Sequence, residues 1–141
     1  MKNLIVAAVA ALSCVAAPAM AGDVTITLTG VQARGGQLLA ALQTQGQFLQ
    51  HAGAYGERIE NPAAGTVVIT FHGVAPGDYS LSALHDQDND GQMKIEDGMP
   101  AEGWGMVNGD TLRGPPTWDQ VKFTVPAQGD VNLTVPMFYF R

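Results

Sequence analysis

Three aspartates, Asp86, Asp88 and Asp90, stand at alternate positions and are followed directly by Gly91. This spacing matches the first half of an EF-hand-type calcium loop, where carboxylate oxygens surround the ion and the glycine permits a sharp turn. Carboxylates held this close repel one another unless a cation lies among them. The pattern predicts a cation site, and calcium is the favoured ion because it takes six to eight oxygen ligands.

The second half of the loop departs from the EF-hand pattern. The ninth position is Lys94, and the twelfth is an aspartate instead of the bidentate glutamate. A strand, not a long helix, is expected before the loop. We predict weak calcium binding, with a dissociation constant of about 10⁻⁴–10⁻³ M, by Asp86, Asp88, Asp90, the backbone carbonyl of Gln92, and Asp97. The alternative is an ordinary turn, because Asp, Asn and Gly favour turns.

The acidic loop begins a longer segment, residues 86–118, that is rich in Gly, Pro and acid. Six of the 13 acidic residues lie in residues 86–102, where Lys94 is the only base. Loops of this length are usually functional or disordered, but this one carries tryptophans and methionines that are costly to leave in water. We expect an ordered loop packed over one end or edge of the domain. Its predicted ligand-binding residues are His85, Glu102, Trp104, Asn108 and Trp118.

The sequence gives little support to an enzyme. Its three histidines show no metal-binding spacing, and no nucleophile elbow, P-loop, GxGxxG or HExxH motif occurs. His85 stands on an expected inward face just before the acidic loop, where we predict a structural hydrogen bond to the loop backbone or to a carboxylate. We therefore predict no catalytic residue. The alternative is an extracellular enzyme that uses His85 with carboxylates such as Asp86 or Glu102.

Short strands are expected to position these residues. Apolar and polar residues alternate, as in half-buried strands, in residues 23–29, 66–71 and 79–85. Further strands are expected at residues 37–42, 121–125 and 131–135, with one short strand around Phe48 in the ambiguous stretch 43–65. Turn signals separate these segments. The pattern predicts an all-β fold, an antiparallel β-sandwich of about seven strands with one long ordered loop.

The first 21 residues have the features of a signal peptide. Lys2 provides a positive charge, an apolar run extends from Leu4 to about Ala17, and Ala19-Met20-Ala21 fits the small-x-small cleavage pattern. The run is shorter than the roughly 20 residues that a membrane span needs. We expect cleavage after Ala21, a β-sandwich domain over residues 22–141 without a transmembrane segment, and a periplasmic or secreted location.

The chain is acidic, with 7 basic residues, 13 acidic residues and a formal net charge of −6. Nucleic acids and anionic membrane surfaces select for basic faces, so this balance argues against both as partners. A cation is the more natural charged partner. The sequence does not identify any protein or small ligand that the domain binds.

Three motifs in order resemble the bacterial DUF2141 family, exported proteins of unknown function. The motifs are HDQDNDGQMK, GMPAEGWGMVN and GPPTWDQVKFTV, beginning at His85, Gly98 and Gly114. The resemblance covers nearly all of the chain after the expected cleavage, and it implies an Ig-like or transthyretin-like β-sandwich, export, and no assigned activity. Lys94 stands where the family pattern has an acid, so a fourth carboxylate ligand would have to come from Glu96 or Asp97.

Three functions therefore remain open at this point. The favoured hypothesis is an exported binding module, stabilised by calcium, whose residues 86–118 form the recognition surface. The second is the extracellular enzyme described above. The third is a structural or assembly component of the cell envelope that uses an exposed sheet edge.

Overall fold

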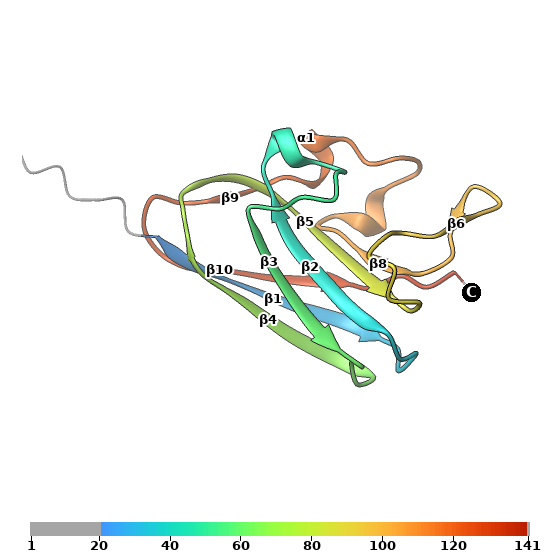
Figure 1. Cartoon of the computed structure of the whole chain (residues 1–141). Helices are drawn as coiled ribbons and strands as arrows, with labels where there is room; N and C mark the ends of the chain where they lie inside the picture. The colour runs from blue at the N-terminus through green and yellow to red at the C-terminus, as the bar shows by residue number, and fades with distance from the viewer. Residues whose placement is uncertain (1–20, 141) are drawn as a thin grey trace, which may run out of the picture.

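The computed structural model describes residues 21–140, which form two β-sheets packed face to face (Figure 1). The expected signal peptide, residues 1–21, lies almost wholly outside these residues and stays a prediction. The first sheet has the strand order β10-β1-β4 and contains β1 (Gly22–Val31), β4 (Gly65–Val74) and β10 (Val131–Pro136). Strand β1 pairs antiparallel with β4 and parallel with β10, so this sheet is mixed.

The second sheet is antiparallel throughout and has the order β3-β2-β5-β8. Its members are β2 (Gln37–Gln43), β3 (Tyr55–Glu60), β5 (Gly77–Asp86), β8 (Gly103–Gly105) and β9 (Phe123–Val125). One side of β5 pairs with β2. Its other side pairs with β9 near the beginning of the strand and with β8 near the end, which places β8 beside the acidic loop.

The long segment after β5 is ordered, as expected. It contains a small hairpin of β6 (Ile95–Glu96) and β7 (Met99–Pro100), then β8 and a 3₁₀ turn, η2 (Gly109–Thr111). A single helical turn, α1 (Trp118–Val121), follows, and another 3₁₀ turn, η1 (Gln45–Gln47), lies after β2. Within residues 21–140, no helix has the length and apolar character required to cross a bilayer.

Alternating side chains of both sheets fill the core between them. In β5 the inward residues are at most 6% exposed, and they are Tyr79, Leu81, Ala83 and His85. In β1 the matching residues, Val24, Ile26 and Leu28, are fully buried. The period-two pattern of the sequence therefore predicted which face of these strands is buried, and the all-β sandwich is confirmed.

Two expectations about individual elements are wrong. No strand forms around Phe48; η1 precedes it, and the strand of this region is β3, six residues long. Gln47 caps the beginning of η1, because its Oε1 accepts the Thr44 N–H at 3.2 Å. The Phe48 ring packs edge-on against Trp118 at 5.7 Å between centroids. The strand expected over residues 121–125 is shorter, because α1 extends through Val121 and β9 begins only at Phe123.

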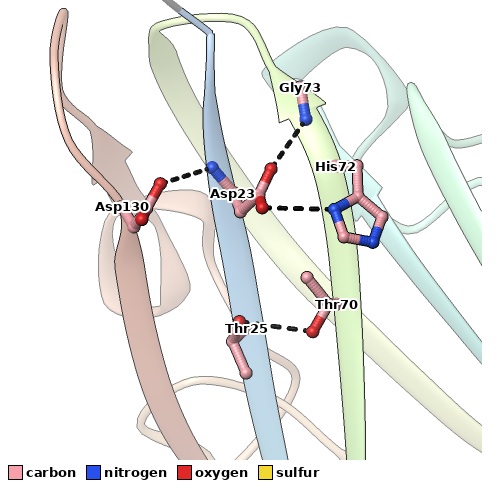
Figure 2. A network of polar contacts seen from close by, with 6 residues as sticks. All are labelled: Asp23, Thr25, Thr70, His72, Gly73 and Asp130. Carbon is pink, nitrogen blue, oxygen red and sulfur yellow. Dashed lines mark hydrogen bonds and ion pairs between the residues drawn. The ribbon is translucent and has the colours of Figure 1, made fainter.

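A polar network near the start of β1 joins this strand to β4 and to Asp130, the residue before β10 (Figure 2). The Asp23 backbone N–H donates to the Asp130 carboxylate at 2.9 Å, and the Gly73 N–H donates to Oδ1 of Asp23 at 3.1 Å. Oδ2 of Asp23 lies 3.2 Å from Nδ1 of His72. The hydrogen bond from Gly73 and the contact with His72 lower the pKa of Asp23 below 3.8.

Candidate metal centre

Strand pairing brings four carboxylates together at the end of β5. Gln37 of β2 lies opposite Asp86, and Gly103 of β8 lies opposite His85, so Glu102 is placed beside the residues that leave β5. One carboxylate oxygen from each member of this group lies within 4.8 Å of those of the other three. We call this group the four-carboxylate cluster; it consists of Asp86, Asp88, Asp90 and Glu102.

Asp86 anchors the loop from its buried centre. Its side chain is fully buried, and Oδ2 accepts hydrogen bonds from Nε2 of Gln37 at 2.7 Å and from the Gly91 N–H at 2.8 Å. Oδ1 accepts the Asp90 N–H at 3.1 Å. Burial raises the pKa of Asp86, but these hydrogen bonds together outweigh burial and hold it below 3.8. Asp86 is therefore ionised, and the loop backbone wraps around its charge.

Glu102 connects the two ends of the same loop. It is 4% exposed, and its carboxylate accepts the Gln87 N–H at 3.0 Å and the Lys94 N–H at 3.2 Å. Burial raises the pKa of Glu102 above 4.5, and the negative charges of Asp88 and Asp86 act in the same direction. The two backbone bonds oppose this shift without cancelling it. The ionised form of Glu102 is therefore disfavoured, mainly by burial and in smaller part by the neighbouring carboxylates.

Asp88 and Asp90 complete the cluster from the exposed side of the loop. The Asp90 N–H also approaches Oδ1 of Asp88 at 3.3 Å, and Oδ1 of Asp90 accepts the Gln92 N–H at 2.9 Å. Partial desolvation and the neighbouring Asp86 raise the pKa of Asp88. Gly91 has a φ of 76°, so it provides the turn predicted from the sequence.

The cluster differs in membership from the ligand set predicted by spacing. Asp97 is not among its four carboxylates; with Gly98 it forms the two-residue turn of the β6–β7 hairpin, at φ values of 51° and 75°. Glu102 is the fourth member instead. It follows Asp90 by 12 positions, and only the pairing of β5 with β8 brings it close, so the loop spacing alone gave no signal for it. The predicted roles of Gln92 and Asp97 as ligands stay predictions.

His85 is held in a structural hydrogen-bond chain. It is fully buried, with Nε2 2.8 Å from the Gly35 carbonyl and Nδ1 2.7 Å from the Tyr139 hydroxyl. A carbonyl only accepts, so Nε2 carries a proton and donates it. The Tyr139 hydroxyl accepts the Gln32 N–H at 3.2 Å. In the neutral ring, a proton on Nε2 leaves Nδ1 as an acceptor, so the Tyr139 O–H donates to it. Both ring nitrogens are bonded within the protein, but the partners are the Gly35 carbonyl and the Tyr139 hydroxyl, so the predicted bond to the acidic loop backbone or to a carboxylate is wrong.

The other predicted ligand-binding residues serve different parts of the fold. Nδ2 of Asn108 donates to the Gln120 carbonyl at 3.1 Å, and Trp118 packs against Phe48. Trp104 packs against Phe138 with 4.8 Å between ring centroids and a tilt of 36°, and it lines a groove of about 1400 Å³ on the outer face of the second sheet. Of the five predicted residues, only Trp104 lines this groove.

Comparison with known proteins gives one family. Residues 26–134 match the family described as uncharacterized protein conserved in bacteria (DUF2141). No curated protein and no solved structure matches the chain. The family match covers both sheets and the four-carboxylate cluster.

Proposed function

The chain belongs to the DUF2141 family of uncharacterized bacterial proteins, and from that premise we propose that the four-carboxylate cluster binds one calcium ion. The observation that supports this proposal is that four carboxylate oxygens lie within 4.8 Å of one another, two of them on the buried residues Asp86 and Glu102. Calcium binds oxygen at about 2.3–2.6 Å, so ligands on opposite sides of one ion are about 4.6–5.2 Å apart. The spread of the cluster lies within this range.

The number of carboxylates favours calcium over magnesium. Magnesium keeps several waters and usually takes only one or two carboxylates, whereas calcium accepts six to eight oxygen ligands, from protein or water, in a flexible arrangement. Four carboxylates provide at least four of these. We propose that the Gln92 carbonyl, Asp97 or water completes the shell.

Calcium would stabilise the loop by removing repulsion that its own hydrogen bonds leave in place. The pKa values of Asp88 and Glu102 are raised, which means that their negative charge is unfavourable in the folded chain. Lys94 is the one base of this loop, and its Nζ pairs with Glu96 at 3.1 Å; the charges of Asp88 and Glu102 also raise its pKa, so a single positive charge is shared among several carboxylates. A divalent ion among the four carboxylates supplies the missing positive charge at short range.

We further propose that this protein is an exported binding module, with residues 1–21 as its cleaved signal peptide. The features of residues 1–21 support export, and the weak affinity expected for the loop suits extracellular calcium sites, whose dissociation constants are about 10⁻⁴–10⁻³ M. In this proposal calcium acts as a structural ion of the loop.

Thermal unfolding of the chain from residue 22 tests calcium binding directly. The protein is stripped with EDTA, dialysed, and melted with 10 mM CaCl₂, with 10 mM MgCl₂, or with neither. A dissociation constant near 1 mM gives about 1.4 kcal/mol of stabilisation at 10 mM ligand, so we expect a higher melting temperature in calcium and a smaller rise in magnesium.

A pair of double variants provides the matched control. Asp88→Asn with Asp90→Asn removes two charges from the cluster, and it should abolish the rise in calcium. Asp119→Asn with Asp130→Asn removes two charges outside the cluster, and it should keep the rise. A melting curve of the unaltered chain that calcium leaves unchanged contradicts the proposal, as does an equal loss of response in both double variants.

A further inference from the structure

The groove on the outer face of the second sheet has a largely apolar floor. The register of β2, β5 and β8 places Leu39, Leu84 and Trp104 side by side in one row across the sheet. The next row on the same face holds Ala41 and Ser82, whose short side chains make the floor lower there. The volume of the groove, about 1400 Å³, exceeds the roughly 300–1000 Å³ of most small-molecule sites.

Exposed apolar side chains form the walls above this floor. Among the residues that the structure describes, five large hydrophobic side chains are prominently exposed, and four of them line the groove at 47–58% exposure: Leu49, Ile95, Met99 and Phe140. The fifth, Val68, is on β4 of the other sheet. Apolar surface is costly to leave in water, so its concentration around one groove marks an interaction site.

The charged side chains of the groove lining balance one another. The acidic residues are Glu57 and Asp110, the Arg and Lys residues are Arg58 and Arg113, and all four are exposed. Both arginines already bond within the protein, the first to a glutamate and the second to two backbone carbonyls. A charged ligand would lose hydration here without meeting a free partner of opposite sign. The lining therefore favours an uncharged ligand.

The floor also offers few free polar groups. Strand β2 lies between β3 and β5, and β5 lies between β2 and β8, so sheet pairing uses the backbone N–H and C=O groups of both strands. Nε2 of Gln43 donates to the carbonyls of Gln50 and Ala52 at 2.8 and 2.9 Å. An extended peptide would bury its own backbone groups against this floor without partners, which is unfavourable. A ligand made mainly of hydrocarbon avoids that cost.

We propose that this groove binds an uncharged, hydrocarbon-rich small molecule such as a long-chain alcohol. The hydrocarbon lies over Ser82, beside Leu84 and Trp104. Met93 and Met99 of the lining adapt to its shape, because methionine is unbranched and polarisable. The inference rests on the proposal that the protein is a binding module, and it names the class of ligand. It does not rest on calcium, because the four carboxylates are not part of the groove lining.

The fluorescence of N-phenyl-1-naphthylamine, an uncharged dye that brightens in apolar surroundings, tests the proposal. The chain from residue 22, which holds every strand of the structure, is titrated in EDTA near neutral pH. Bound dye is then displaced by hexanol, octanol, octanoate or octylammonium. We expect saturable binding, and displacement by octanol at a concentration at least tenfold lower than by either charged octyl compound, because burying a charge is unfavourable. Octanol should displace about 15-fold more strongly than hexanol, since each CH₂ strengthens apolar burial about fourfold.

Two groove variants and one control locate the site. Ser82→Phe fills the lower row of the floor and should weaken dye binding about tenfold. Ile95→Ser with Met99→Ser removes apolar side chains from the hairpin wall without changing charge, and it should have a similar effect. Val68→Phe adds the same aromatic side chain to the outer face of the other sheet, and it should change nothing.

Failure of this proposal is distinguishable from failure of the calcium proposal. Asp88→Asn with Asp90→Asn should bind the dye as the unaltered chain does, whatever its response to calcium. Absence of saturable binding, equal displacement by the three octyl compounds, or an unchanged affinity in either folded groove variant overturns the proposal. So does a dimer of the unaltered chain that the hairpin variant dissociates, since a second copy would then occupy the groove.

Discussion

Asp23 lies near the start of β1 and Asp86 at the end of β5, and these two places are at opposite ends of the sandwich (Figure 1). Both carboxylates accept backbone N–H groups, and hydrogen bonds lower the pKa of both. The Asp23 carboxylate contacts His72, which can carry positive charge, while one acid, Asp130, accepts the Asp23 backbone N–H (Figure 2). Around Asp86 the neighbours are three more carboxylates.

Asp23 and the acidic loop differ in how the negative charge of their carboxylates is compensated. The Asp23 network is complete within the protein, because two neighbouring residues of β4, His72 and Gly73, meet its carboxylate. The loop donates its backbone N–H groups to Asp86 and Glu102, but burial, together with the neighbouring charges of Asp88 and Asp86, still raises the pKa of Glu102. Backbone donors satisfy hydrogen bonding without supplying a full positive charge, so only the loop calls for an external cation.

The largest effect that tests this contrast is expected from Asp86→Ala. The change leaves Nε2 of Gln37 and the N–H groups of Gly91 and Asp90 without their buried acceptor. Urea unfolding in EDTA should show a loss of about 3 kcal/mol in the free energy of unfolding. Asp23→Ala, measured alongside, should cost less, because that network is more exposed. If both variants lost the same free energy of unfolding, the hydrogen bonds of Asp86 and Asp23 would contribute equally to stability, and the contrast drawn above would be wrong.

The next effect concerns calcium and the identity of the fourth ligand. Glu102→Gln should abolish most of the calcium-induced rise in melting temperature, whereas Asp97→Asn should retain most of it, because Asp97 lies outside the four-carboxylate cluster. The full rise corresponds to about 1.4 kcal/mol at ten times the dissociation constant. If Asp97→Asn abolished the rise and Glu102→Gln kept it, the fourth carboxylate ligand would be Asp97, as the EF-hand spacing predicts.

A smaller effect is expected in the pH dependence, and it has opposite sign at the two ends. The pKa of Glu102 is raised above 4.5, so its contribution to stability is fully present below pH 4.5 and is lost as pH rises through the folded-state pKa. The pKa of Asp23 is lowered from 3.8, so its contribution is present above pH 3.8 and is lost as pH falls. Unfolding of the unaltered chain, Glu102→Gln and Asp23→Asn in EDTA between pH 3 and 7 measures both differences. If the two stability differences, each variant against the unaltered chain, changed with pH in the same direction, the opposite pKa shifts of Glu102 and Asp23 would be contradicted.

The smallest effect is expected from His72→Ala. The His72 side chain is 78% exposed where it meets Asp23, and exposed pairs are strongly screened by salt. We expect a slight loss of stability in 20 mM salt that disappears in 500 mM NaCl. A large, salt-independent loss would show that this network contributes more than its exposure indicates.

Prediction from the sequence succeeded where one face of a strand is buried. The alternation in residues 23–29 and 79–85 located β1, β5 and their inward faces, because burial on one side imposes a period of two. It failed for β3, whose residues are mostly exposed and whose sequence therefore shows little alternation. Parallel pairing of β10 with β1 also left no local pattern, since it joins segments about 100 positions apart.

The part of the candidate site that lies within one turn was predictable from the sequence, and the part that depends on strand pairing was not. Asp86, Asp88, Asp90 and Gly91 were found from local spacing, because one turn brings them together. Glu102 was placed only in the wider ligand-binding loop, since its position in the cluster depends on the register between β5 and β8. Its two hydrogen bonds to the loop backbone show why an acid is suited to this position.

The bond between His85 and Tyr139 has a consequence for the order of events during synthesis. The two residues are 54 positions apart, so at about 5–20 residues per second the ribosome makes the tyrosine roughly 3–11 s after the histidine. Phe138 joins Trp104 by two further backbone bonds. We expect a nascent chain that stops at Met137 to leave the end of β5 open to protease, and a chain that includes Tyr139 to close it; equal cleavage of the two would show that the tail is dispensable for maturation.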